Sequence, residues 1–338
     1  MISEQVVDLL YHIDLATEGI MNCLDIGRDF LPYFECWLRT DPPKLVHTEW
    51  DHVDITGRFL YALILSRMVT KKQHQISIER RLRKLLFSSL SEGNGLSYRP
   101  NLRKETANSR KHLAHMHELR SVLFALTALI QYEGDKQAKN YANKLVQRLY
   151  HLTMKQKGLL ALKYYHDGTW YPKDRMVFPP YTSGRNILAL IEYFKATQDS
   201  LAIDIAEKFV KSNLQCFLED GAIREIAEYY PELCHFHSIS ATLAGIIAYG
   251  RLIGDQQLVE RGKHIYDNPH GLKKYGSSFG WFKENIMISF LKERIYQRFN
   301  FAAQGTLHNV YVRYGTVLSQ TNLLEFMLIY GLIKKLIQ

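Results

Sequence analysis

A short segment near residue 50 carries several side chains that could do acid–base chemistry. Trp50 is followed by Asp51, and Asp54 comes three residues later, where a helix is expected to begin. Residues three apart share one face of a helix, and carboxylates are stabilised at its positive end. Cleavage of a glycosidic bond needs two carboxyl groups, one as the acid and one as the base or nucleophile. The alternative is that each aspartate caps the helix.

Glu118 and Asp174 are the next carboxylates that we consider catalytic. Glu118 stands at the start of a second expected helix, and Asp174 lies between Lys173 and Arg175. A positioned carboxyl group can also protonate a vinyl ether and activate water. Glu118 could instead be an ordinary residue in the first turn of its helix.

Histidines accompany these carboxylates. His117, His235 and His237 precede expected helices, whereas His112 and His115 are expected in a solvated loop. The first three could bind a metal together, but we favour helix-entry histidines that bond to backbone or sugar hydroxyl groups. We therefore predict neither a metal nor a cofactor.

Arginines and tryptophans complete the set of candidates. Arg58 and Arg185 occupy equivalent positions in two expected helices, and a buried arginine must find an acceptor. The repetition favours bonding to loop carbonyl groups, although arginine can also bind a carboxylate through two hydrogen bonds. Trp50 and Trp281 present aromatic faces of the kind that bind sugar rings, or else they belong to the core.

Composition limits the classes of partner and site. The 338 residues are 46% hydrophobic, with a net charge of +9, which permits an acidic partner. The basic residues are scattered apart from a short cluster at residues 80–84, and no nucleic-acid-binding motif accompanies them, so we predict no nucleic-acid partner. Four cysteines without a Cys-x-x-Cys pair, in a chain of this size, argue against a disulfide framework and a structural zinc site. The N-terminus lacks a secretory signal and no apolar run is long enough to span a bilayer, so we expect a cytoplasmic protein.

A helical hairpin over residues 235–267 is the element that must position these side chains. Its first helix is apolar on nearly every side, with Ile239, Leu243 and Ile246, and such helices are usually buried. Its second helix has one apolar and one charged face. One hairpin of this kind cannot bury its own apolar surface, so it requires further copies.

The copies are visible in the sequence. The run Gly57-Arg58-Phe59-Leu60-Tyr61-Ala62-Leu63 lines up with Gly184-Arg185-Asn186-Ile187-Leu188-Ala189-Leu190, and residues 120–126 form a weaker third version. The turns Gly134-Asp135, Gln198-Asp199 and Gly254-Asp255 recur as well. The repeat is about 55–65 residues long, which exceeds the ~34–47 of common helical solenoids and leaves residues between hairpins for a binding face.

Other elements are expected between and around the hairpins. We predict helices over residues 4–24, 28–39, 284–299 and 318–337, an inner helix to about Met68 with an outer partner over 75–90, and a short β-hairpin within 158–182. Ser183 is expected to cap the third inner helix.

These motifs together resemble a known superfamily. The Gly-Arg-x-Leu-x-Ala-Leu helix openings, the Gly-Asp turns, His237-Ser238 before residues 241–245, and residues 276–281 resemble the six-hairpin glycosidases over about 28–283. The chain is similar to bacterial β-L-arabinofuranosidase-type and unsaturated-uronide hydrolase-like proteins. It lacks the cysteine cluster of the zinc–thiolate arabinofuranosidases and a C-terminal β-sandwich, and its pattern weakens after Trp281.

The resemblance implies an all-α fold, an (α/α)6 toroid formed as one domain by residues 1–338. Its C-terminal end is either an irregular closing pair of helices or a degraded repeat, which would leave the toroid incomplete. Loops at the N-terminal ends of the inner helices would meet at a central cleft. The expected function is glycoside hydrolysis of an oligosaccharide substrate. The catalytic candidates are Asp51, Asp54, Glu118 and Asp174, and the binding candidates are Trp50, Arg58, His117, Arg185, His235, His237 and Trp281. The alternatives are a non-catalytic sugar-binding or scaffold toroid, and a sugar epimerase that uses paired histidines. The oligomeric state stays open.

Overall fold

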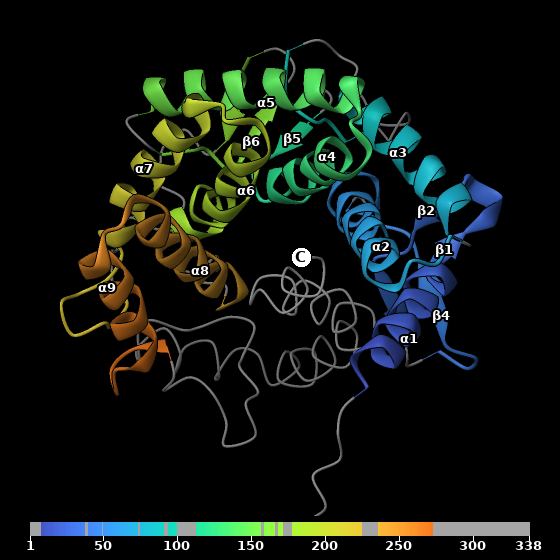
Figure 1. The fold of residues 1–338 in the computed structure, drawn as a ribbon, viewed down its shortest axis with the longest axis horizontal. Helices are drawn as coiled ribbons and strands as arrows, with labels where there is room; N and C mark the ends of the chain where they lie inside the picture. Colours follow the sequence, from blue (N-terminus) through green and yellow to red (C-terminus); the bar gives the residue numbers. More distant parts are fainter. Residues whose placement is uncertain are drawn as a thin grey trace, which may run out of the picture.

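The computed structural model describes residues 8–37, 40–48, 50–73, 75–90, 94–99, 113–156, 159–165, 168–171, 178–224 and 236–272. Over these ranges the chain is built mainly from helices that are paired into hairpins. The hairpins follow one another around an arc (Figure 1).

Four hairpins and one leading helix make up the helical part of these ranges. The leading helix is α1 (Leu9–Asn22). The hairpins are α2 (Thr56–Thr70) with α3 (Ile76–Leu90), α4 (Leu119–Glu133) with α5 (Lys136–Lys155), α6 (Ile187–Thr197) with α7 (Ser200–Leu214), and α8 (Phe236–Ile253) with α9 (Gln256–Asp267). Short helical turns lie at η1 (Ile26–Arg28), η2 (Asp51–Ile55), η3 (Pro179–Tyr181) and η4 (Gly184–Asn186). The predicted helices over 284–299 and 318–337 lie outside the described residues.

The inner and outer helices differ in their burial as the sequence predicts. The helices α2, α4, α6 and α8 line the inner side of the arc, and α3, α5, α7 and α9 cover its outer side (Figure 1). Every residue of α4 from Leu119 to Leu129 is buried, whereas α5 buries one stripe that includes Ala138, Ala142 and Leu145. An inner helix packs against neighbours on several sides, whereas an outer helix has one solvent-exposed face. The all-α toroid architecture is therefore confirmed.

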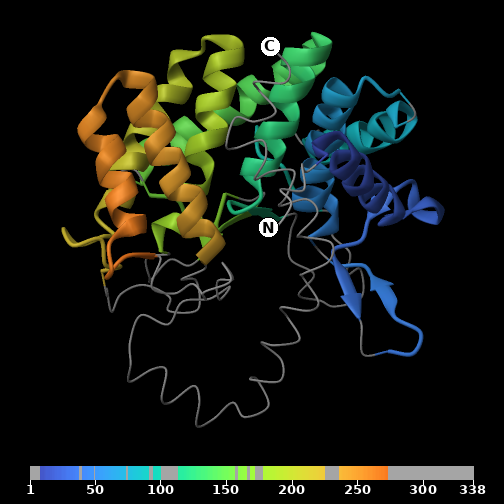
Figure 2. The same ribbon diagram turned by 60° about the horizontal axis from the view of Figure 1, so that its bottom comes forward.

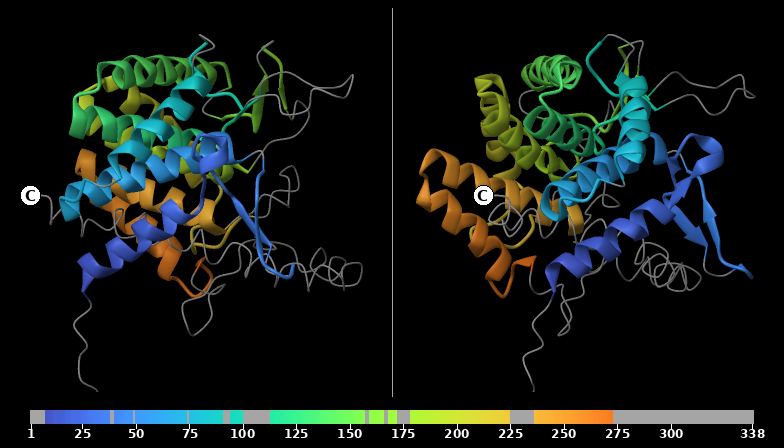
Figure 3. Two further views of the ribbon diagram at one scale, coloured as in Figure 1. Left: turned by 90° about the vertical axis from the view of Figure 1, so that its right-hand side faces the viewer. Right: turned by 45° about the vertical axis from the view of Figure 1, so that its right-hand side comes forward.

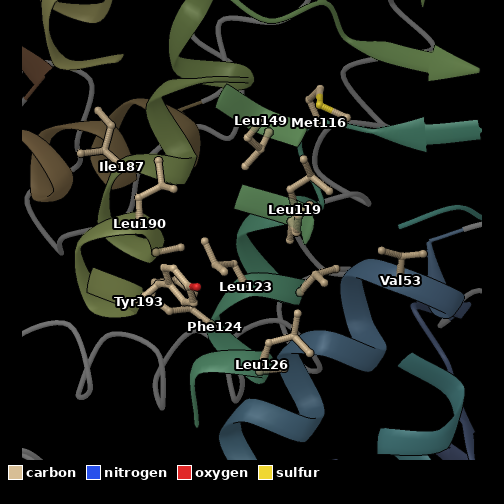
Figure 4. Close-up of a cluster of buried hydrophobic side chains, with 14 of the residues drawn as sticks. Val53, Met116, Leu119, Leu123, Phe124, Leu126, Leu149, Ile187, Leu190 and Tyr193 are labelled. Atoms are coloured by element: carbon tan, nitrogen blue, oxygen red, sulfur yellow. The ribbon is translucent and has the colours of Figure 1, made fainter. Parts of the chain in front are cut away.

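The hydrophobic core is continuous between neighbouring inner helices. Figure 4 shows Leu119, Leu123 and Leu126 of α4 near Leu190 and Tyr193 of α6. All five side chains are fully buried. Since successive hairpins share such contacts, each hairpin covers apolar surface that its neighbour cannot cover alone.

Short strands occupy one end of the helices (Figures 2 and 3). The pairs are β1 (Leu24–Asp25) with β2 (Leu31–Pro32), β3 (Glu35–Trp37) with β4 (Lys44–Val46), and the order β5 (Leu113–His115), β6 (Lys163–Tyr165), β7 (Trp170–Tyr171). All of these pairs are antiparallel. The strands β6 and β7 confirm the β-hairpin that was predicted within 158–182.

The predicted turns recur at the other end of the inner helices. Gly134 and Gln198 end α4 and α6 with positive φ angles of 63° and 61°. The aspartates that follow, together with Asp255 after α8, each accept a backbone N–H of the next outer helix. An aspartate N-cap stabilises a helix start because it satisfies a donor that has no partner within the helix.

The glycines of the Gly-Arg motif allow neighbouring helices to approach closely. A Cβ atom at Gly57 would lie 2.8 Å from the backbone carbonyl of Ser121 on α4. A Cβ atom at Gly184 would overlap the side chain of Thr242 on α8. Both positions therefore require glycine for contact between inner helices rather than for a turn.

Two local predictions are wrong. The predicted helix over 28–39 is replaced by β2 and β3, because residues 35–37 pair with residues 44–46 and this pairing is invisible to a local pattern. Ser183 does not cap a helix: its hydroxyl donates to the carbonyl of Pro179 and accepts from Asn213.

One described helix, α8, is long and apolar enough to cross a membrane by length and composition alone, contrary to the expectation from the sequence. Its mean hydropathy is 1.2 over 18 residues, and it packs against α6, α7 and α9 as an inner helix. This packing accounts for its composition. A cytoplasmic location stays a prediction.

Candidate active site at the N-terminal ends of the inner helices

The predicted site residues that the structure describes gather at one end of the inner helices. They stand on η2 before α2, on the turn before α4, on η4 before α6 and in the first turn of α8. Asp174, His235 and Trp281 lie outside the described residues. The topology therefore assembles residues far apart in the sequence, as the resemblance implied.

Asp51 is fully buried and holds the segment before η2. Its carboxylate accepts the backbone N–H of Thr48 at 2.7 Å, and one oxygen lies 2.8 Å from Nδ1 of His47. Nε2 of His47 lies 2.9 Å from Asp25. An imidazole between two carboxyl groups bonds to both in one of two ways: it carries two protons and donates to each, or one carboxyl group keeps its proton and donates to the imidazole. Burial raises the pKa of Asp51 above its usual value despite these contacts.

Asp54 forms a different kind of contact. Nε and Nη2 of Arg58 donate to its two oxygens at 3.0 and 2.9 Å, and the Ser121 hydroxyl donates at 2.5 Å. Burial alone would raise its pKa, but the charges of Arg58 and Arg185 and the Ser121 hydrogen bond hold the pKa of Asp54 below its usual value. This carboxylate is ionised at neutral pH and has no proton to donate.

Glu118 is also paired with an arginine. Nε and Nη2 of Arg99 donate to its carboxylate at 2.9 and 2.7 Å, and both side chains are buried. The guanidinium of Arg99 also lies over the ring of Trp50, 4.1 Å from its centroid. One arginine thus connects a predicted catalytic residue with a predicted sugar platform.

Aromatic and imidazole rings form the centre of the cluster. The ring of Trp50 lies 5.1 Å from His115 and 5.7 Å from His117, and Tyr181 lies 4.5 Å from His117, measured between centroids. His115 is buried on β5, so its predicted place in a solvated loop is wrong. Burial, with the charges of Arg99, Lys163 and Arg185, holds the pKa of His115 well below its usual value.

A further histidine, His52, is half-buried on η2. Burial lowers the pKa of His52 to about 4, and positive charges nearby add to this effect. His52 and His115 are therefore neutral at pH 7, and a neutral imidazole can accept a proton. The sequence analysis missed His52, Arg99 and Tyr181, although His52 stands beside Asp51 in the segment that it singled out.

Arg185 joins three of the inner helices. It is only 1% exposed on η4, and its Nη1 lies 2.9 Å from Nδ1 of His117 and 3.3 Å from the Ser238 hydroxyl on α8. Burial, followed by the charges of Arg120 and Arg58, lowers its pKa well below the usual value. Among the described residues, nothing accepts a hydrogen bond from its Nε or Nη2.

The opposite, C-terminal end of the inner helices α2 and α4 has a different character. A cavity of about 230 Å³ is lined there by Arg67, Glu79, Arg83 and Glu133. Arg67 donates to both glutamates, and Arg83 donates to Asp135. This cavity contains none of the predicted site residues. Within the described ranges, no three His, Cys, Asp or Glu side chains form a group that could hold a metal ion.

Comparison with known proteins identifies the fold. No family model matches the chain, and no curated protein matches it. Among solved structures, a D-mannose isomerase aligns with a TM-score of 0.61 and 14% identity, over 82% of this chain and 72% of that one. A sugar epimerase from a ruminal bacterium aligns with 0.56 and 13%, over 80% and 74%. An unsaturated glucuronyl hydrolase from Bacillus sp. GL1 aligns with 0.53 and 10%, over 69% and 67%.

The resemblance to the six-hairpin glycosidase superfamily is thus confirmed at the level of the fold. Proteins with this fold include both hydrolases and enzymes that isomerise or epimerise sugars. At identities of 10–14%, these alignments identify the fold and not a reaction.

Proposed function

We propose that the protein is a carbohydrate-active enzyme of the isomerase or epimerase class, in which histidines move the protons. One observation carries this proposal: Asp54 and Glu118 are each engaged by the two donors of an arginine, which leaves the histidines of the same cluster as the candidate acid–base groups. This arrangement favours histidine acid–base chemistry over a pair of reactive carboxylates.

The proposed reaction starts from the open-chain form of an aldose. A histidine removes the proton from C2, and the electron pair forms the C1–C2 double bond of an enediolate. Return of a proton to C1 gives the ketose, and its return to the other face of C2 gives the epimer. No atom is gained or lost in either case. The N-terminal ends of the inner helices and the buried arginines stabilise the negative charge on the enediolate oxygens.

His117 and His237 are the proposed acid–base pair. His117 contacts Arg185, and Arg185 contacts Ser238, the neighbour of His237 on α8. The two histidines thus come from two different inner helices that share one arginine. Trp50 and Tyr181 are the proposed aromatic platforms for the C–H faces of the sugar.

Glycoside hydrolysis is the second candidate. Burial raises the pKa of Asp51, as a general acid requires, and Asp174 is the carboxylate we would pair with it. The contacts of Asp51 with His47 and Thr48 also fit a purely structural role. A sugar-binding toroid without catalysis is the third candidate.

Incubation with D-mannose, D-glucose and cellobiose in D2O tests the proposal. Both reactions give new NMR signals without the mass of an added water, and isomerisation places deuterium at C1 whereas epimerisation places it at C2. We expect His117→Gln to abolish conversion, and the exposed residue His151 supplies the matched control, His151→Gln. New reducing ends from oligosaccharides, with no isomer formed, would instead establish the hydrolase. Binding without any conversion would favour the non-catalytic toroid.

A further inference from the structure

Buried and half-buried arginines in this protein present the same edge to carboxylates. Nε and Nη2 of Arg58 bind Asp54, those of Arg99 bind Glu118, and those of Arg67 bind Glu79. This edge matches the spacing of two carboxylate oxygens, so the pair gains geometric specificity as well as charge.

Arg185 presents the same edge without a carboxylate. Its Nη1 is engaged by His117 and Ser238, while Nε and Nη2 have no acceptor in the part of the chain that is described. A buried guanidinium edge without an acceptor is costly, because its Nε and Nη2 groups have lost their hydration and gained no hydrogen bond in exchange. An arginine kept in this state points to a partner outside the chain.

The surroundings of Arg185 strengthen this reading. Among the described residues of the cluster, Arg58, Arg99, Arg120 and Arg185 are buried, as are Asp51, Asp54 and Glu118; Asp54 pairs with Arg58 and Glu118 with Arg99. The positive ends of α2, α4, α6 and α8 add to the potential. The net charge of +9 extends the same preference to the whole protein.

We propose that the Nε–Nη2 edge of Arg185 binds the carboxylate of a sugar acid, an inference that rests on the carbohydrate site proposed above. A carboxylate suits the site better than a phosphate. Its two oxygens fill one arginine edge and its single charge balances one guanidinium, whereas the edges of Arg58 and Arg99 are already occupied. Sugar acids are then the substrates or close substrate analogues of this enzyme.

Calorimetric titration of matched sugar pairs tests the inference. The pairs are D-glucuronate with D-glucose, and D-galacturonate with D-galactose. We expect each acid to bind at least tenfold more tightly than its neutral partner. We expect Arg185→Met to weaken acid binding by about 10- to 100-fold, the range for charge-assisted hydrogen bonds, and to weaken the binding of the neutral partners much less. Arg185→Lys keeps the charge and loses the two-donor edge. Its affinity for sugar acids should therefore lie between the affinities of the wild type and of Arg185→Met.

A control separates the local contact from overall charge. Arg80 is exposed on α3, and Arg80→Met removes one positive charge without touching the site. We expect this variant to bind sugar acids like the wild type. Arg185→Met also removes the contacts of Nη1 with His117 and Ser238. If this variant fails to fold, the wild-type comparison of acid with neutral sugar decides alone.

Several outcomes would overturn the inference. Equal wild-type affinity for acid and neutral sugars would do so, as would an equal loss of both in Arg185→Met, which would assign Arg185 to the reaction itself. Tighter, Arg185-dependent binding of glucose 6-phosphate would replace the carboxylate by a phosphate. Conversion of neutral aldoses without any binding of sugar acids would overturn this inference and leave the proposed function intact. Arg185-dependent binding of a sugar acid without conversion of any sugar would support this inference and overturn the proposed function.

Discussion

Two aspartates three residues apart on η2 show how neighbours decide the charge of a buried carboxyl group. Asp51 and Asp54 are both buried. Burial dominates at Asp51 and raises its pKa, whereas two guanidinium groups and a hydroxyl outweigh burial at Asp54 and lower its pKa. Desolvation and nearby charge act in opposite directions on a carboxylate. Position and residue type alone therefore do not assign a catalytic role to either residue.

Asp54→Asn should be strongly destabilising. It leaves Arg58 buried without its partner, and breaking a buried pair costs about 3–5 kcal/mol. Urea unfolding at pH 7 measures the loss. Addition of Arg58→Met to this variant should recover part of it, because no unpaired charge then remains at this position. Additive losses in the double variant would contradict the assigned pair.

The same ion pair gives a dependence on pH. The pKa of Asp54 is lower in the folded chain than the usual 3.8. Its stabilisation is therefore fully present at neutral pH and is lost as the pH falls below about 4. Asp54→Asn should remove this part of the acid sensitivity, which urea unfolding between pH 5 and pH 3 would detect.

His52 should make stability fall at a higher pH. Its pKa is about 4 in the folded chain and 6.5 for the free group, so the unfolded chain takes up a proton first as the pH falls. Stability is lost from about pH 6.5 down to about pH 4, and the loss is on the order of 1 kcal/mol by pH 5 for a half-buried group. His52→Asn should flatten this slope. If NMR shows that the ring of His52 titrates near pH 6.5 in the folded protein, this expectation is wrong.

The sequence reveals contacts between residues that are close along the chain. Arg58 and Asp54 are four apart, so a helix places them together and the sequence alone shows the pair. Arg99 and Glu118 are 19 apart, and Arg185 and His117 are 68 apart. Such contacts depend on how the hairpins close, so residue spacing predicts the members of the site but not their partners.

At the scale of elements, the repeated turns were predictable because glycine and aspartate have local backbone requirements. Gly134 adopts a positive φ angle and Asp135 caps the next helix, and both effects follow from a few adjacent residues. The error over residues 28–39 has the opposite cause. Its strands are two and three residues long and are defined by partners farther along the chain.

The capping aspartates should differ in their contributions. Asp255→Ala should cost about 1 kcal/mol of unfolding free energy, because it removes only the cap of α9. Asp135→Ala should cost up to about 1 kcal/mol more, since Asp135 also accepts from the partly exposed Arg83 at 2.6 Å. Urea unfolding compares them. Asp255→Asn keeps the acceptor and is the matched control, and a loss equal to that of Asp255→Ala would argue against the cap.

Gly57→Ala should disturb both packing and the site. The added methyl group meets the backbone of Ser121, and overpacking of this kind costs about 1–3 kcal/mol. Ser121 also donates to Asp54, so a shift of α4 changes the environment of that carboxylate. The free energy of unfolding and the proposed turnover, measured on the same sample, should both be lower than in the wild type. Unchanged stability would show that α2 and α4 are not in the close contact described.

At the scale of the whole molecule, the repeat was the informative signal. Apolar inner helices and two-faced outer helices recur in order, and each hairpin covers apolar surface of the next. The reaction was less predictable, because one architecture serves both hydrolases and isomerases. That residues 1–338 form a single domain stays a prediction, since the described part ends at residue 272.

The two ends of the inner helices also suit different practical uses. The 15 residues of α4 separate its N-terminal end from the turn at Gly134 by about 22 Å. The corresponding turn after α8 is solvent-exposed, and Gln257 follows it on α9. A cysteine introduced there, as Gln257→Cys, offers a chemical handle for tethering the protein to a solid support or a sensor surface. The end that bears the arginines and histidines would then stay accessible to dissolved sugars.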